Sequence, residues 1–374
     1  MAFPPTPVSQ PSQPQPAPPT ISSISPPQPN TLNRLHRPQS QLPQPHTPSR
    51  SQSQSQSQSQ PQPPTSPPTA QNLQAARYAR TGVRPPPKMD NRRRFKAFID
   101  RINRRQWELV GDGVHSRLTY NTHDTSLYEL IQHLKHEFAP RTNVTLEIVI
   151  ILGGTESDAD TDPDHKSPVA ARLRVKTILV QGPYLASSPR KKFEYARHMV
   201  AHFTRNKISS ITDISAPTHT HPSTAPITPP PALRPPPPRV SIDIHAFFAA
   251  YISTINSSRG APDALAPFCN PAGVVHNGVK LSVDRYSRLI GEAFEAIDGL
   301  EFEAQMVLVD EAAQQMAALI EFTGVPVKPF GGAVPPGGDR LVRFVEIVFY
   351  WLEQGRISDV LSLVDLDSYR EQLS

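Results

Sequence analysis

Two features of this sequence have the residue types and spacing of chemically active sites. The loop Glu156–Asp164 carries aspartates at alternate positions, as calcium-binding loops do. It has Pro163 where such a loop needs glycine and Val169 where it needs a bidentate glutamate. Cys269 is the single cysteine, and no base stands near it in the sequence pattern. We therefore expect a solvated hairpin tip and a small buried thiol rather than a calcium site and a nucleophile.

Histidines and a glycine-rich segment are the next candidates. The histidines lack cysteine partners and the spacing of zinc motifs, so we expect no metal ion and no cofactor. They are His115, His123, His133, His136, His198 and His202. The segment FGGAVPPGG at 330–338 has neither the lysine nor the strand–helix context of a phosphate-binding loop.

The elements that would position any site are confined to two parts of the chain. Of the 45 prolines, 23 fall in residues 1–88 and 10 in residues 215–240. The first segment is rich in Pro, Gln and Ser and is expected to be disordered, and the second reads as a Pro-rich linker. Two domains are predicted between and after them, at 89–214 and 241–374. The tail has PxxP-like segments and Ser/Thr-Pro sites, so it is a candidate for recruiting protein partners.

Composition also limits the cellular context. The N-terminus lacks the basic start and apolar run of a secretory signal, and no stretch has the length of a membrane span. A single cysteine excludes an intrachain disulfide and fits a reducing compartment. The basic run Arg77–Arg105 could touch nucleic acid, but the net charge of +5 is modest and a solvated flank is the favoured interpretation. We expect an intracellular protein, cytoplasmic or nuclear, with no membrane association and no nucleic-acid partner.

The two predicted domains look like copies of one pattern. LVGDGVHSRLTYN at 109–121 aligns without a gap to LAPFCNPAGVVHN at 265–277. An Ile-Asn pair precedes each segment, and a helical pattern follows each, at 126–138 and at 282–297. After that the apolar period changes to two and ends in a terminal strand pair, at 193–214 and at 344–365. A duplication of one unit explains this order.

Helices followed by strands joined by tight turns predict an α+β fold in each copy. The helices are expected to pack on one face of a strongly curved antiparallel sheet. The terminal strands are apolar on both faces, which indicates that the second face is covered too. The simplest cover is the sheet of the other copy, which gives a pseudo-dimer within the chain; homodimerisation through the second copy is the alternative.

The second copy contains four distinctive segments: HNG at 276–278, FTG at 322–324, the hairpin FGGAVPPGGDR and the ending VEIVFYWLEQGRISDVLSLVDLDSYREQL. Through these segments it resembles the SnoaL-like domains of the nuclear transport factor 2-like superfamily. It covers residues 243–373, and residues 92–214 resemble the family more weakly. It implies a cone with a pocket at its open end. Members include polyketide cyclases, dehydratases and isomerases as well as binding modules, so the fold alone does not define an activity.

The resemblance also implies where an acid/base should stand. SnoaL-type cyclases use a strand aspartate, seven residues after a turn glycine, and a histidine seven residues before it. In the second copy these positions hold Ser362 and Val348; in the first they hold Asp213 and Met199. The first copy therefore keeps a candidate catalytic carboxylate, with Tyr195 and Arg197 on adjoining positions of the same face.

Polar residues at further matching positions are candidate ligand-binding groups. Arg197 and its counterpart Glu346 either pair or line a polar cavity, or reach solvent at the rim of the cone. Tyr120 with Asn121, and His276 with Asn277, either line a pocket wall or form hydrogen bonds where the chain begins the second helix. Ser362 completes this set.

Two functions from different classes follow. In the first, the cones bind a small apolar ligand or a partner and the C-terminal copy is non-catalytic. In the alternative, the protein is a polyketide cyclase-like isomerase or dehydratase with Asp213 as acid/base.

Overall fold

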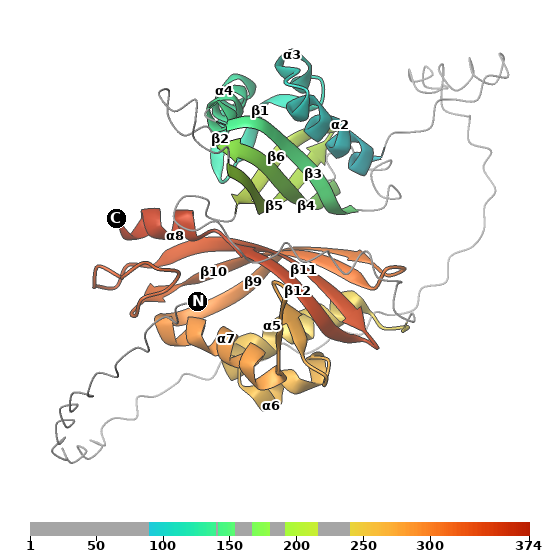
Figure 1. Ribbon diagram of the computed structural model, residues 1–374. Helices are drawn as coiled ribbons and strands as arrows, with labels where there is room; N and C mark the ends of the chain where they lie inside the picture. Colours follow the sequence, from blue (N-terminus) through green and yellow to red (C-terminus); the bar gives the residue numbers. More distant parts are fainter. Residues whose placement is uncertain (1–89, 140, 154–166, 180–190, 216–239) are drawn as a thin grey trace, which may run out of the picture. The chain divides into compact units, whose positions relative to one another are not determined.

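The computed structural model describes residues 90–139, 141–153, 167–179, 191–215 and 240–374. The predicted disordered tail, most of the Pro-rich linker and the acidic loop lie outside these ranges. All the described residues belong to one compact unit. Within it the two predicted copies appear as two sheets, each with its own helices (Figure 1).

The N-terminal copy begins with three helices interrupted by a short hairpin and ends in four long strands. Its sheet has the order β2-β1-β6-β5-β4-β3. The elements are α2 (Asn91–Asn103), α3 (Trp107–Val110), β1 (Val114–Tyr120), β2 (His123–Ser126), α4 (Leu127–Phe138), β3 (Arg141–Gly153), β4 (Ser167–Leu179), β5 (Lys191–Thr204) and β6 (Lys207–Ser215).

The C-terminal copy repeats this order and adds a final helix. Its sheet has the equivalent order β8-β7-β12-β11-β10-β9. The elements are α5 (Ile244–Ser258), α6 (Pro262–Leu265), a 3-10 turn (Ala266–Phe268), β7 (Val274–His276), β8 (Val279–Leu281), α7 (Val283–Ala296), β9 (Ile297–Asp310), β10 (Gln315–Pro326), β11 (Val342–Glu353), β12 (Arg356–Val364) and α8 (Leu366–Leu373).

The predicted α+β class and helix-on-sheet arrangement are confirmed, with one refinement of the sheet. The long strands are antiparallel as expected. A short strand pairs parallel with the last long strand in each copy, β1 with β6 and β7 with β12, so both sheets are mixed. These short strands lie in the segments whose alignment revealed the repeat. The sequence pattern did not identify them as strands because β7 has only three residues and β1 lacks a strict alternation of apolar and polar side chains.

Local sequence signals explain why the helices begin where they do. Ser126 and Ser282 cap the second helix of each copy by accepting hydrogen bonds from the backbone N–H groups of Glu129 and Arg285. Glu129 completes a capping box by accepting from the backbone of Ser126. The two helices therefore start at matching residues, and positions along them can be compared directly between the copies.

Four tight hairpins also match. The two central turn residues have positive φ in each, as type I′ turns require. They are Asn121–Thr122 and Arg205–Asn206 in the N-terminal copy, and Asn277–Gly278 and Gln354–Gly355 in the C-terminal copy. Since a two-residue turn fixes the register of its strands, these turns bring the same strand positions face to face in both copies.

The asparagine of the Ile-Asn pair has the same role in both copies. Asn103 exchanges two hydrogen bonds with the backbone of Leu146, at 2.9 and 2.8 Å. Asn256 does the same with the backbone of Phe302, at 2.9 and 3.0 Å. Each asparagine thus ties the end of the first helix to the first long strand, which supports the duplication at the level of single side chains.

Apolar side chains fill two separate cores, one between helices and sheet in each copy. A third buried cluster draws on the opposite faces of both sheets; it includes Ile150 and Val200 from one copy and Phe349 and Trp351 from the other. His198 Nδ1 also lies 2.7 Å from the carbonyl oxygen of Ile347. On this basis we propose that the two sheets pack face to face, as the apolar pattern of the strands predicted.

Placing a charge in this third cluster tests the proposed packing. Phe349 is 1% exposed and its ring meets that of His198 edge-on at 5.0 Å. Phe349→Asp should destabilise the protein by about 3–5 kcal/mol, because it removes a large side chain and leaves an unpaired buried carboxylate. Thermal unfolding measures the loss, with the exposed Val334→Asp as control. An unchanged melting temperature for Phe349→Asp would mean that this face is open to solvent.

Candidate functional site

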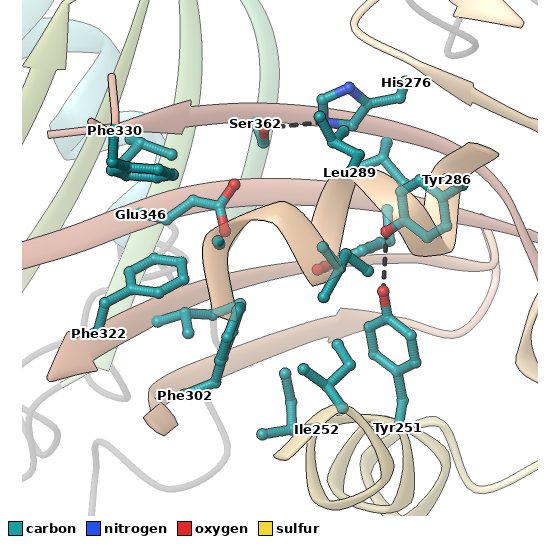
Figure 2. Close-up of a pocket in the computed structure, with 17 residues that line it drawn as sticks. Tyr251, Ile252, His276, Tyr286, Leu289, Phe302, Phe322, Phe330, Glu346 and Ser362 are labelled. Atoms are coloured by element: carbon teal, nitrogen blue, oxygen red, sulfur yellow. Dashed lines mark hydrogen bonds between the residues drawn. The ribbon is translucent and has the colours of Figure 1, made fainter. Parts of the chain in front are cut away.

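A cavity of about 200 Å³ lies between the helices and the sheet of the C-terminal copy (Figure 2). Its wall is mainly apolar and aromatic, and its polar groups come from α5, α7, β7, β11 and β12. The lining residues are Tyr251, Ile252, Ile255, His276, Tyr286, Leu289, Ile290, Ala293, Phe302, Ile320, Phe322, Phe330, Glu346, Tyr350, Val360, Ser362 and Val364.

Among the described residues that line this wall, Glu346 is the single acidic one and none is a lysine or an arginine. The side chain extends from β11 into the space between the phenylalanine rings and the His276–Ser362 pair (Figure 2). Burial raises the pKa of Glu346 to about 7, and a hydrogen bond with Ser362 partly opposes this shift. Glu346 keeps some accessible surface because it faces the cavity. Near neutral pH its carboxyl group therefore exists in both protonation states.

Hydroxyl and imidazole groups surround this carboxyl group. The hydroxyls of Tyr251 and Tyr286 share a hydrogen bond of 2.8 Å, and burial raises the pKa of both phenols, so both stay protonated. Ser362 Oγ and His276 Nε2 share a hydrogen bond of 3.2 Å. Burial lowers the pKa of His276, which keeps its imidazole neutral at pH 7. The cavity thus offers neutral donors and one titratable acid.

Aromatic rings close one side of the cavity. Phe302 meets Phe322 edge-on at 4.6 Å, and Phe322 stacks on Phe344 at 5.1 Å. Phe330 comes from the glycine-rich segment after β10 and packs edge-on against Tyr369 of α8 at 5.5 Å. Gly331 has a positive φ of 56° and lies close to Leu366, so this segment turns tightly against α8. A segment without the features of a phosphate loop therefore supplies a hydrophobic wall.

The corresponding positions of the N-terminal copy are occupied by a network of charged side chains. Arg197 donates from Nε to Asp213 Oδ1 at 2.6 Å and also donates from Nη2 to Asp213 Oδ2. Its Nη1 donates to Glu137 Oε1 at 2.9 Å, and the Tyr120 hydroxyl donates to Asp213 Oδ2 at 2.7 Å. Both carboxylate oxygens of Asp213 are thus engaged by donors from the protein itself.

Burial and charge act against each other in this network. Burial alone would lower the pKa of Arg197, but the negative charges of Asp213 and Glu137 raise it well above its usual value. Burial and the charge of Asp213 raise the pKa of Tyr120. The side chains of Arg197 and Asp213 are only 3% and 2% exposed. Arg197 is therefore a paired, buried cation rather than a residue at a solvent-exposed rim.

The two asparagines expected near the second helix have a structural role. Asn121 exchanges hydrogen bonds of 3.0 and 2.7 Å with the backbone of Asp213. Asn277 makes the equivalent pair with the backbone of Ser362, at 3.2 and 2.9 Å. The neighbouring side chains, Tyr120 and His276, are the ones directed at the site. In each pair the asparagine therefore forms the structural hydrogen bonds, and its neighbour, Tyr120 or His276, faces the site.

The remaining candidates contribute to the cores. Cys269 is fully buried, and burial raises the pKa of its thiol to about 12, which removes the thiolate needed for attack. Tyr195 is buried in the N-terminal core. His198 is buried and lies 2.6 Å from an Arg172 guanidinium nitrogen through its Nε2. Nowhere in the described part of the chain do three His, Cys, Asp or Glu side chains gather as metal ligands do.

Several of these residues were predicted from the sequence, and others were not. His276, Glu346 and Ser362 come together at the C-terminal cavity, and Tyr120, Arg197 and Asp213 come together in the N-terminal network. Tyr251, Tyr286, Ala293 and Phe330 were missed. The two tyrosines had a detectable signal, since they replace the apolar Phe98 and Leu130 at matching helix positions of the other copy.

The C-terminal copy is similar to a known family of proteins. The model of the SnoaL-like polyketide cyclase family matches residues 246–373. A SnoaL-like polyketide cyclase from Agrobacterium tumefaciens has 30% identity over 36% of this chain and 99% of its own, with a TM-score of 0.32. TsrD from Streptomyces laurentii has 18% identity over 36% of this chain and 98% of its own, also with a TM-score of 0.32. None of the curated proteins is significantly similar in sequence to the chain.

The family model thus identifies the C-terminal domain, over residues 246–373, as a SnoaL-like polyketide cyclase domain. The N-terminal copy shares its order of elements and its sheet topology. Within the described ranges no helix is both long and apolar enough to cross a membrane.

Proposed function

We propose that the C-terminal domain binds a small uncharged carbonyl compound and that Glu346 moves a proton at the carbon next to the carbonyl group. The observation that carries this proposal is the Glu346 carboxyl group inside an apolar cavity, with a pKa raised to about 7. A general base works best when its pKa lies near the working pH. The family's usual aspartate position holds Ser362, but Glu346 on the adjacent strand places a carboxylate in the same cavity.

The cavity supplies both groups that this proton transfer needs, a base for the carbon proton and a hydrogen-bond donor for the enolate oxygen. The Glu346 carboxylate takes a proton from the carbon next to the carbonyl, and the C–H electron pair forms an enolate. Tyr251 shares a hydrogen bond with Tyr286 and forms a further side-chain hydrogen bond with Tyr350. In this proposal one phenol of the group donates to the enolate oxygen, where hydrogen bonding stabilises the developing charge. Glu346 then returns a proton to carbon.

The wall of the cavity defines the class of ligand. An anionic ligand would meet Glu346 with no lysine or arginine to compensate its charge. The volume of about 200 Å³ is below the roughly 300–1,000 Å³ of sites for drug-sized molecules, which favours a ligand of one or two rings. The phenylalanine side of the cavity suits a flat apolar ring.

Deuterium exchange tests this proposal with a simple probe. 2-Indanone is a small uncharged ketone whose carbon protons next to the carbonyl can be followed by NMR in D₂O. The protein should accelerate their exchange, and Ala293→Phe, which fills the cavity from α7, should abolish the acceleration. The exposed Val334→Asp is the matched control. Binding of the probe without exchange would favour a pure binding module; neither binding nor exchange would refute the proposal.

A further inference from the structure

The polar network of the N-terminal copy is built from the positions that line the cavity in the C-terminal copy. Met199 faces Asp213 across β5 and β6 as Val348 faces Ser362 across β11 and β12. Because these registers match, Asp213 corresponds to Ser362. Arg197 stands two residues before Met199, as Glu346 stands two residues before Val348. The two strand positions of the site therefore hold an ion pair in one copy and a glutamate with a serine in the other.

The other two members of the network have counterparts in the cavity wall as well. Tyr120 ends β1 beside Ile211, as His276 ends β7 beside Val360. Counted from the capping serines of α4 and α7, Glu137 corresponds to Ala293. All four residues that bond to one another in the N-terminal copy thus correspond to residues that line the cavity in the C-terminal copy. They are Tyr120, Glu137, Arg197 and Asp213, matched by His276, Ala293, Glu346 and Ser362.

We propose that the ion pair between Arg197 and Asp213 takes the place of a ligand in the N-terminal copy, so that the residues at these two positions decide which copy holds a site. The guanidinium group satisfies both carboxylates that point toward it and is held by at least four hydrogen bonds. A ligand entering there would have to displace charges that are already paired and nearly excluded from water. The N-terminal domain is then a structural partner of the C-terminal domain.

Transfer of the pair into the C-terminal copy tests this inference. Glu346→Arg alone buries an uncompensated cation and should lower the melting temperature by about 10 °C. Adding Ser362→Asp should restore most of the loss and, by occupying the cavity, abolish binding of 2-indanone. Ser362→Asp alone, which adds a second acid beside Glu346, is the matched control. Failure of Ser362→Asp to rescue Glu346→Arg, or retained probe binding in the double variant, would overturn the inference.

The reverse transfer should open the other copy. In the full chain, Arg197→Glu combined with Asp213→Ser should raise the number of 2-indanone sites, measured by titration calorimetry, from one to two. A count that stays at one in a folded double variant would refute the role assigned to the pair. Absence of probe binding to the wild-type protein would instead count against the proposed function. In that case the rescue of melting temperature in the C-terminal copy still decides whether the pair can be built there.

Discussion

Replacement of Glu346 by glutamine should lower the protein-catalysed exchange of 2-indanone protons by about 10²–10⁴-fold, the range expected for loss of a general base. Glutamine keeps the size of the side chain and its ability to form hydrogen bonds, but it cannot take up a proton at neutral pH. Binding of the probe should therefore change little while the exchange rate falls. NMR of the probe in D₂O measures the rate, and calorimetry measures the binding.

The pH dependence of the wild-type exchange rate tests independently whether Glu346 is the base. In the proposed mechanism the carboxylate form of Glu346 is the base, and its pKa is raised to about 7. Below this value the protein-catalysed exchange rate should fall about tenfold per pH unit, and above it this rate should level off. A rate that is flat from pH 5 to pH 8, or an unaffected Glu346→Gln variant, would remove Glu346 from the mechanism.

Stability measurements exclude unfolding as the cause of a lost rate. Glu346 has a pKa of about 7 in the folded protein against 4.5 for an ordinary glutamate, so the folded state binds this proton more tightly. Its contribution to stability is therefore most favourable below pH 4.5 and is lost as pH rises through 7, by at most about 3 kcal/mol. Glu346→Gln does not titrate, so its melting temperature should match wild type at pH 5 and equal or exceed it at pH 8.

The sequence predicted most of the fold because the fold depends on repeated local signals. Apolar spacing located α2, α4, α5 and α7, and turn residues located the hairpins before each terminal strand. The duplication could be seen because Asn121 and Asn277 perform the same structural task and stand in aligned segments. The short strands β1 and β7 were missed because their partners are distant in sequence and their own pattern is too brief.

The site was only partly predictable because its character depends on contacts across the sheet. The sequence placed Glu346 and Ser362 on one face, but it gave no measure of the enclosure that shifts the pKa of Glu346. The family resemblance also marked Asp213 as a candidate acid/base by its distance from the turn. The guanidinium group of Arg197, two strand positions from Met199 on the neighbouring strand, engages that carboxylate, and such pairing appears only when both strands are placed.

Arg197→Met should be among the most destabilising single substitutions in the N-terminal domain. It removes the cation that compensates the carboxylates of Asp213 and Glu137, and Asp213 has almost no access to water. Loss of one partner from a buried pair costs about 3–5 kcal/mol, because the other charge is left uncompensated. Thermal unfolding should show a clear drop in melting temperature. The exposed pair between Lys328 and Glu295 offers a control, since Lys328→Met should change stability little.

Removal of both charges should behave differently from removal of one. Arg197→Met combined with Asp213→Leu replaces the pair by apolar groups and should recover much of the lost stability, because the cost of the single substitution comes from the orphaned carboxylate. A double variant less stable than Arg197→Met would show that the pair itself supplies the net stabilisation.

Substitution of Asp213 distinguishes between the two candidate catalytic carboxylates, Asp213 and Glu346. If Asp213 were an acid/base, Asp213→Asn would abolish exchange in the probe assay while leaving Glu346 intact. We expect the opposite: Asp213→Asn should weaken the N-terminal domain, because its amide cannot accept both guanidinium hydrogen bonds as a carboxylate does, and should leave exchange unchanged under conditions where the protein stays folded. Arg197 already binds both oxygens of the Asp213 carboxylate and Tyr120 binds one of them, whereas Glu346 faces an open cavity. We therefore expect the chemistry in the copy whose carboxylate has no cation beside it.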